Sequence, residues 1–163
     1  SAALTNQFDH LLVLRGTSKF FATPGLRLGY ALTKNAELLQ SAKAMQDPWN
    51  INSVAETVGS VMFTDEEYIH LVQKTMEDEK TYICDALKKI DGMKIFPANG
   101  NIVLAKLPKG SLTSDELFDI LIRQGLMIRS CTTFQPLGNR FIRICFMSHE
   151  DNVKLINAIK DAI

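Results

Sequence analysis

The sequence has no apolar run that approaches the roughly 20 residues a helix needs to cross a bilayer, so no membrane span is predicted. Cysteine is scarce: three residues at wide spacing indicate reduced thiols of a cytoplasmic protein rather than a disulfide framework. The three histidines have no ligand spacing, and no metal centre is expected. Because 18 basic residues balance 18 acidic ones, nucleic acid and anionic membranes are not expected as partners. We also expect no signal peptide.

One stretch, Leu11–Leu32, combines two apolar runs with a lysine and an arginine. The first run, Leu11–Leu14, is typical of a buried strand, and a second run with β character, Leu26–Leu32, follows a bend. Lys19 and Arg27 lie eight residues apart, each near the edge of a strand, where they can converge on one ligand. The amine can form a Schiff base with a carbonyl, and the guanidinium can bind a phosphate bidentately. Taken alone, this spacing is more typical of solvated side chains in an ordinary hairpin.

The longer string TSKFFATPGLRLGY resembles the cofactor-lysine segment of the fold-type I pyridoxal-phosphate enzymes, the class I/II aminotransferases. The nearest resemblance is to the branch of histidinol-phosphate aminotransferase and threonine-phosphate decarboxylase. It implies that Lys19 holds pyridoxal phosphate as a Schiff base and that Ser18 and Arg27 bind the cofactor's phosphate. The sequence departs from the family at Gly16, where a second hydroxyl is often found, and Thr17 lies one place from that position.

The resemblance also implies the fold class, which is α/β. We expect the C-terminal part of the fold-type I transferase fold: the end of the large-domain sheet, a long connecting helix, and a small α/β domain with a mainly antiparallel sheet. Residues 1–52 should be strands and a helix of the cofactor-binding large domain, 53–90 connecting helices, and 91–163 the small domain.

The cofactor lysine falls well past the middle of family members but is residue 19 here, so the chain is expected to lack an N-terminal part. A natural small protein built on the motif is the alternative. The apolar strands of the first ninety residues should then expose faces and edges that favour self-association of the isolated chain. The segment from about Asp91 has alternating strands and capped helices of its own, and it should fold unaided.

A second pair of cationic residues lies in two further predicted strands. In Arg140–Phe146 the isoleucines alternate with Arg143, which therefore projects away from the face packed on helices. In Leu126–Ser130, Arg129 lies on the face opposite Ile128. The two arginines could face one cleft, and a guanidinium among apolar residues needs an anion because an unpaired buried charge is costly.

The resemblance suggests what that anion is. FIRICF is similar to the family's C-terminal segment, whose arginine pairs with the substrate's α-carboxylate, and this implies that role for Arg143. LMIRS resembles the strand whose arginine contacts a phosphate-bearing substrate, and this implies a substrate contact for Arg129. A structural ion pair with an acidic neighbour is the alternative for each arginine.

Several helix starts are predicted from capping residues. Asn35 is a plausible N-cap, capping boxes begin at Thr64 and Thr113, and Ser148–Asp151 is expected to cap the last helix. The charged run 77–80 in the longest helix is interpreted as a solvated face. Trp49 could line an active-site wall, but a core position is favoured.

Together these features predict an enzyme that transfers an amino group between a small amino acid, including a phosphate-bearing one, and a 2-oxo acid. Lys19 is the predicted catalytic residue, with Ser18 and Arg27 at the cofactor and Arg143 and Arg129 at the substrate. The family resemblance implies a homodimer, and we expect the 163-residue chain alone to be inactive. The alternatives are a lyase similar to threonine-phosphate decarboxylase and a non-catalytic, self-associating domain that retains the fold.

Overall fold

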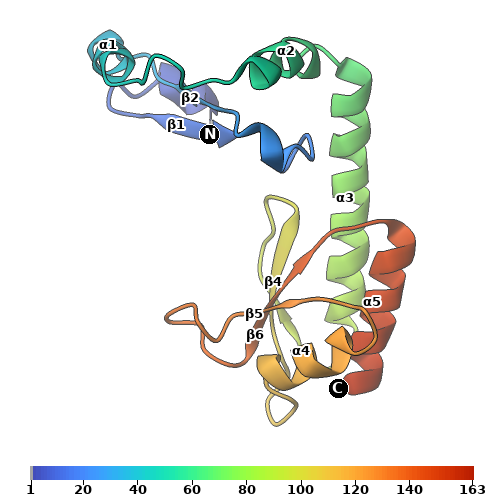
Figure 1. The fold of residues 1–163 in the computed structure, drawn as a ribbon. Helices are drawn as coiled ribbons and strands as arrows, with labels where there is room; N and C mark the ends of the chain where they lie inside the picture. The colour runs from blue at the N-terminus through green and yellow to red at the C-terminus, as the bar shows by residue number, and fades with distance from the viewer. Residues whose placement is uncertain (1) are drawn as a thin grey trace. The chain divides into compact units, whose positions relative to one another are not determined.

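The computed structural model describes residues 2–163, which form two compact units (Figure 1). The first unit ends at Ile69, and the second runs from His70 to Ile163. The domain limits at residues 52 and 90 stay a prediction. None of the helices in the described residues has the length and apolarity needed to cross a membrane.

The first unit contains a short antiparallel hairpin that follows a 3-10 turn over Ala2–Asn6. Strand β1 (Val13–Gly16) pairs with β2 (Gly29–Leu32), so that Val13 lies opposite Leu32. The second strand was predicted to begin at Leu26, which is wrong, because Pro24–Leu26 forms a 3-10 turn instead. Pro24 fixes a φ angle suited to such a turn. Arg27, the first residue after the turn, has a positive φ, which lies outside the β region of a strand.

Most side chains of this hairpin are exposed. In β1 only Val13 is half-buried, and all four residues of β2 are exposed. Leu14 is 74 % exposed. It lies in a continuous apolar run, a pattern typical of strands that are covered on both faces of a sheet. The chain therefore presents apolar strand surface that its own described residues do not cover.

Two helices follow the hairpin. Helix α1 (Ala36–Ala44) begins after Asn35, whose side chain accepts a hydrogen bond from the Leu38 backbone, as the sequence predicted. Helix α2 (Ser53–Met62) begins in the same way after Asn52. Residues 41–52 are all exposed, and Trp49 is 90 % exposed. The predicted core position of this tryptophan is therefore wrong within the described residues, 2–163.

The long helix α3 (Glu66–Lys88) begins one residue later than its predicted capping box implied. Asp65 caps it, because its carboxylate accepts a hydrogen bond from the Tyr68 backbone at 2.9 Å. Thr64 does not cap this helix; its hydroxyl donates to the Val61 carbonyl near the end of α2. Adjacent side chains therefore bond the last turn of α2, through Thr64, and the first turn of α3, through Asp65.

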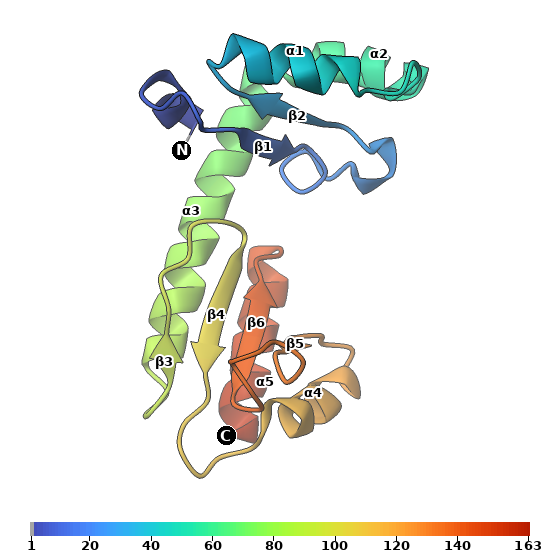
Figure 2. The same ribbon diagram turned by 90° about the vertical axis from the view of Figure 1, so that its left-hand side faces the viewer.

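The second unit is built on a four-stranded antiparallel sheet, as predicted. The strands are β3 (Lys94–Ile95), β4 (Ile102–Lys106), β5 (Arg129–Ser130) and β6 (Phe141–Cys145), in the order β3-β4-β6-β5 (Figure 2). The strand predicted over 126–130 is shortened to its last two residues. The Leu126 N–H instead donates to the Leu121 carbonyl, and Gly125, between them, has a positive φ. These two features form the C-terminal cap of the preceding helix.

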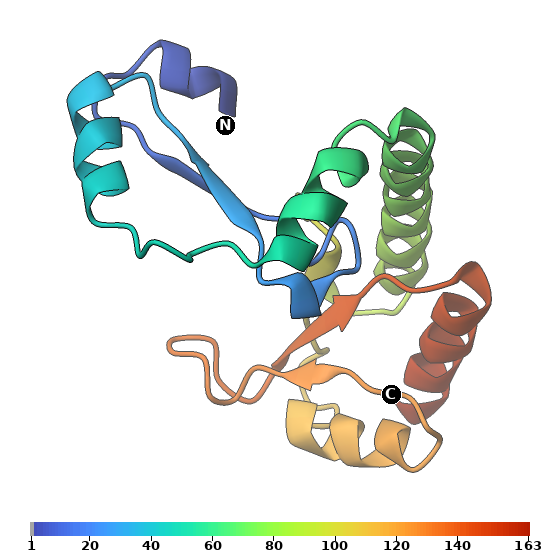
Figure 3. The same cartoon turned by 45° about the horizontal axis from the view of Figure 1, so that its top comes forward.

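Three helices bury one face of this sheet. Helix α4 (Ser114–Ile122) begins with the predicted capping box of Thr113 and Glu116 and packs against β5 and α5 (Figure 3). Helix α5 (His149–Ala162) begins after Ser148, also as predicted. The fully buried core side chains come from α3, β4, α4, β6 and α5; they include Ile83, Leu87, Val103, Leu117, Leu121, Ile142, Ile144, Ile156 and Ile159.

A buried polar cluster joins α3 to the start of α5. The carboxylate of Glu79 lies 3.0 Å from His149 Nδ1 and accepts a hydrogen bond from Asn152 Nδ2 at 2.8 Å. Asn152 is fully buried and also bonds both backbone groups of Met147. Glu79 therefore does not belong to the solvated face predicted for 77–80, because the polar side chains of α5 make its burial possible.

We expect Asn152→Ala to lower the free energy of unfolding by about 2–3 kcal/mol, because it removes one of the two partners of the buried Glu79 carboxylate and leaves two backbone groups of Met147 without their side-chain partner. Urea unfolding of the 163-residue chain measures the change. Asn157→Ala is the matched control: Asn157 is exposed on the same helix, and its replacement should change the value by no more than about 0.5 kcal/mol. Equal effects of the two substitutions would show that the cluster does not stabilise the fold.

Candidate functional site

The structure places Ser18, Lys19 and Arg27 in the connection between β1 and β2. Thr17 anchors the start of this connection: it is buried, and its backbone N–H and hydroxyl both donate to the Leu28 carbonyl. The Thr17 hydroxyl therefore has a structural partner inside the loop. Lys19 is exposed, and in the described residues no hydrogen bond or ion pair joins it to Ser18 or Arg27.

The same connection holds two strained residues. Ala22 and Arg27 have φ angles of +52° and +56°, in the left-handed region that non-glycine residues rarely adopt. Such residues cost about 1–3 kcal/mol each and cluster at binding sites. The Arg27 guanidinium donates to the Pro24 carbonyl at 2.9 Å, which leaves its other N–H groups available. The hydroxyl oxygen of Thr23 is buried without a hydrogen-bond partner.

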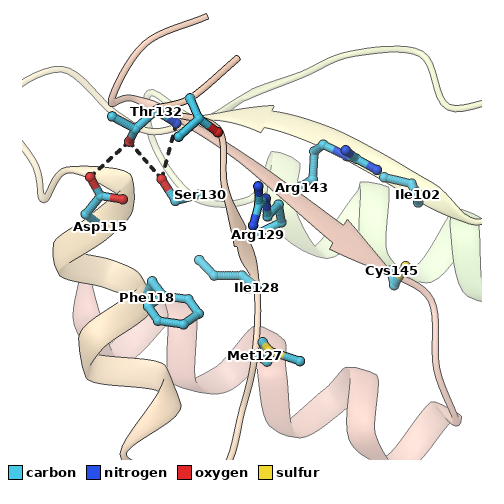
Figure 4. A pocket seen from close by; sticks show the side chains of 11 residues that line it. Ile102, Asp115, Phe118, Met127, Ile128, Arg129, Ser130, Thr132, Arg143 and Cys145 are labelled. Carbon is cyan, nitrogen blue, oxygen red and sulfur yellow. Dashed lines mark hydrogen bonds between the residues drawn. The ribbon is translucent and has the colours of Figure 1, made fainter.

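The second unit contains a cavity of about 530 Å3 with two arginines in its wall. Arg129 and Arg143 lie directly opposite each other on β5 and β6. Figure 4 shows both side chains at this cavity, with Ile102, Phe118 and Met127 contributing apolar surface. The prediction that both arginines face one cleft is confirmed, and their roles remain predictions.

Neither arginine forms a structural ion pair: within residues 2–163, no carboxylate lies within 4.0 Å of the guanidinium of Arg129 or Arg143. The ion-pair alternative considered from the sequence is therefore not supported. Two cationic groups in the wall of one cavity, without an acidic partner within residues 2–163, are chemically suited to bind an anion.

A cluster of hydroxyl groups forms another part of the wall. The Thr132 hydroxyl donates to the Asp115 carboxylate at 2.9 Å and lies 2.8 Å from the Ser130 hydroxyl, which in turn lies 2.9 Å from that of Ser114 (Figure 4). The hydroxyls of Ser130 and Thr132 hold the pKa of Asp115 below its ordinary value. Sequence reasoning missed this cluster, because its members come from α4, β5 and the following loop.

The cysteines are free thiols, as expected from their number and spacing. Burial raises the pKa of Cys131, beside the two arginines, and also the pKa of Cys84 on α3. A thiol with a raised pKa is a poor nucleophile at neutral pH. No group of residues suited to hold a metal ion occurs in the part of the chain that the structure describes.

Comparison with known proteins decides the family. The model of the family described as aminotransferase class I and II matches residues 2–159. The chain belongs to this family. Histidinol-phosphate aminotransferase of Clostridium novyi is 36 % identical over 94 % of the chain. A protein of Caldanaerobacter subterraneus, provisionally named a threonine-phosphate decarboxylase, is also 36 % identical, over 96 % of the chain.

The fold agrees with the family. The crystal structure of histidinol-phosphate aminotransferase from Clostridium acetobutylicum matches 98 % of the chain with a TM-score of 0.90 and 31 % identity. The chain spans 41 % and 42 % of the length of the two relatives named above and 47 % of this structure. The expected fold class, the C-terminal part of the fold-type I transferases, is thereby confirmed.

Aminotransferases of this family depend on pyridoxal phosphate. The donor set of the β1–β2 connection fits this cofactor: an exposed amine can bind an aldehyde, and a hydroxyl and a guanidinium can bind a phosphate. The positive φ of Arg27 agrees with this fit, because residues in such conformations cluster at binding sites.

Proposed function

We propose that this chain is the C-terminal part of a pyridoxal-phosphate-dependent aminotransferase that acts on a small amino acid and a 2-oxo acid. The observation that carries the proposal is the pair of arginines, Arg129 and Arg143, which face one cavity without an acidic partner in the described residues. An amino-acid substrate brings the carboxylate that such a pair requires. Membership of the aminotransferase family supplies the reaction class.

In this proposal the β1–β2 connection binds the cofactor. Lys19 would hold the cofactor covalently through its aldehyde carbon, and Ser18 and Arg27 would bind its phosphate. Bound pyridoxal phosphate supplies an electron sink for the substrate's Cα bonds. Once the substrate amine has displaced it from the cofactor, the Lys19 amine would take a proton from the substrate Cα as a general base and deliver it to the cofactor carbon that bore the aldehyde as a general acid.

Arg143 binds the substrate α-carboxylate. Its planar guanidinium can form two parallel hydrogen bonds, which fix the orientation of the carboxylate as well as its position. That orientation determines which Cα bond is broken. Arg129, on the neighbouring strand, binds a second anionic group of the substrate, such as a phosphate. A homodimer located in the cytoplasm completes the proposal.

A threonine-phosphate decarboxylase is the second candidate, favoured by the equal identity of the two relatives. It would use the same residues with the carboxylate held so that it leaves as carbon dioxide. A third candidate is a non-catalytic domain that self-associates through the exposed apolar surface of the first unit.

Assays of the complete enzyme with histidinol phosphate and threonine phosphate distinguish these candidates. We expect histidinol phosphate with 2-oxoglutarate to yield glutamate. Histidinol phosphate has a phosphate but no α-carboxylate, so the arginine pair would bind its phosphate in the first half of the reaction, and Arg143 would bind the α-carboxylate of 2-oxoglutarate in the second half. Release of carbon dioxide from threonine phosphate, without glutamate, would instead establish the decarboxylase. Absence of both activities in a protein that also binds no pyridoxal phosphate would favour the non-catalytic domain. The 163-residue chain alone, which should show no turnover in either assay, is the control.

A further inference from the structure

Arg129 and Arg143 form an unfavourable pair in the absence of a ligand. They are directly opposite residues of the antiparallel strands β5 and β6, and like charges at such positions repel each other. Asp115 is the carboxylate in the wall of the same cavity, and it accepts a hydrogen bond from Thr132 rather than from either arginine. Arg129 is exposed and Arg143 is half-buried, so solvent screens part of this repulsion, and a protein group that attracts both guanidinium groups would offset more of it.

The aromatic ring of Phe134 is that group. Its centroid lies 5.6 Å from the Cζ atom of Arg129 and 5.4 Å from the Cζ atom of Arg143. Both distances fall within the roughly 6 Å over which the negative face of an aromatic ring attracts a cation. A single ring thus contacts both guanidinium groups of the cavity, although Phe134 is not among the residues that line it in the described chain.

The backbone holds this ring in place. The N–H of Phe134 donates to the Cys131 carbonyl at 2.9 Å, and the N–H of Leu137 donates to the Phe134 carbonyl at 2.7 Å. Cys131 is fully buried, and its own N–H donates to the Phe141 carbonyl on β6, two residues from Arg143. The loop that carries the ring is therefore attached to a strand that carries one of the arginines.

We propose that Phe134 is a positioning residue that keeps both guanidinium groups ready for an anionic ligand. A carboxylate in its place would offset the charges but would also occupy the N–H donors. A ring face attracts the cation without accepting those in-plane hydrogen bonds, so the donors stay free for the ligand. This inference rests on the proposed function in one respect, which is that the anion belongs to the substrate.

Calorimetric titration of the 163-residue chain with inorganic phosphate tests the binding step directly. Phe134→Leu keeps an apolar side chain and removes the ring, and we expect it to weaken phosphate binding about fivefold to thirtyfold. Phe134→Tyr keeps the ring and should restore binding to within about twofold. Leu137→Ala perturbs the same loop without removing the ring, and it should leave the dissociation constant nearly unchanged.

In the complete enzyme, Phe134→Leu should raise KM for the amino acid by a similar factor, with a smaller change in kcat and none in cofactor affinity. If Arg143→Ala raises KM but Phe134→Leu does not, the inference is overturned and the proposed function stands. If Arg143→Ala also leaves KM unchanged, the assignment of the arginines fails as well. An effect of Leu137→Ala as large as that of Phe134→Leu would reduce the role of Phe134 to that of a loop anchor.

Discussion

Replacing Lys19 with alanine in the complete enzyme should abolish covalent attachment of pyridoxal phosphate and lower kcat by a factor of about 100 to 10,000 or more. A factor of about 100 to 10,000 is the usual contribution of one general acid–base residue. The loss of kcat should be greater than this contribution, because the same amine also holds the cofactor. Two measurements check the result: the amino-transfer rate, and the yield of adduct that is fixed by borohydride.

Lys43→Ala is the matched control for this experiment. Lys43 is exposed near the end of α1, in the same unit as Lys19, and its removal should leave both measurements unchanged. A borohydride-stable adduct that persists in Lys19→Ala would show that another lysine holds the cofactor. The proposed chemistry of the β1–β2 connection would then be wrong.

Replacing Arg143 with alanine should raise KM for the amino acid far more than it changes the dissociation constant of the cofactor. Removing one partner of a buried charged pair costs about 2–5 kcal/mol, which is about thirtyfold to several thousandfold in affinity. Arg27→Ala should give the opposite pattern, since its guanidinium is assigned to the cofactor phosphate. Steady-state kinetics and cofactor titration of the two variants separate these roles.

Two further variants sharpen that experiment. Arg143→Lys keeps the positive charge but loses the planar pair of donors, so it should recover only part of the lost affinity. Arg123→Ala removes an exposed arginine at the end of α4 and should change neither constant. Equal weakening of cofactor binding by Arg143→Ala and Arg27→Ala would contradict the division of roles between the two arginines.

Much of the second unit could be predicted because its signals are local. Capping side chains lie within three residues of the backbone groups they bond, as at Thr113 and Ser148. Alternation within one strand is enough to place Arg143 opposite the core face, since successive strand residues point to opposite sides. The shared cavity of Arg129 and Arg143 followed from applying this rule to two strands.

The errors arose where a distant residue decides the outcome. Glu79 looked like part of a solvated face, but His149 and Asn152, about seventy positions later, provide its partners. The contact of Phe134 with two arginines depends on a loop conformation that no local pattern specifies. A core position was favoured for Trp49, but this side chain is 90 % exposed in the described residues.

The central claim is that this chain carries the lysine to which pyridoxal phosphate is attached. Borohydride reduction of the complete enzyme with bound cofactor, followed by proteolysis and mass spectrometry of the peptides, tests it most directly. We predict that the added mass lies on the peptide containing Lys19, and that the peptides containing the other lysines of the chain are unmodified. A modified peptide elsewhere, with Lys19 unlabelled, would contradict the account.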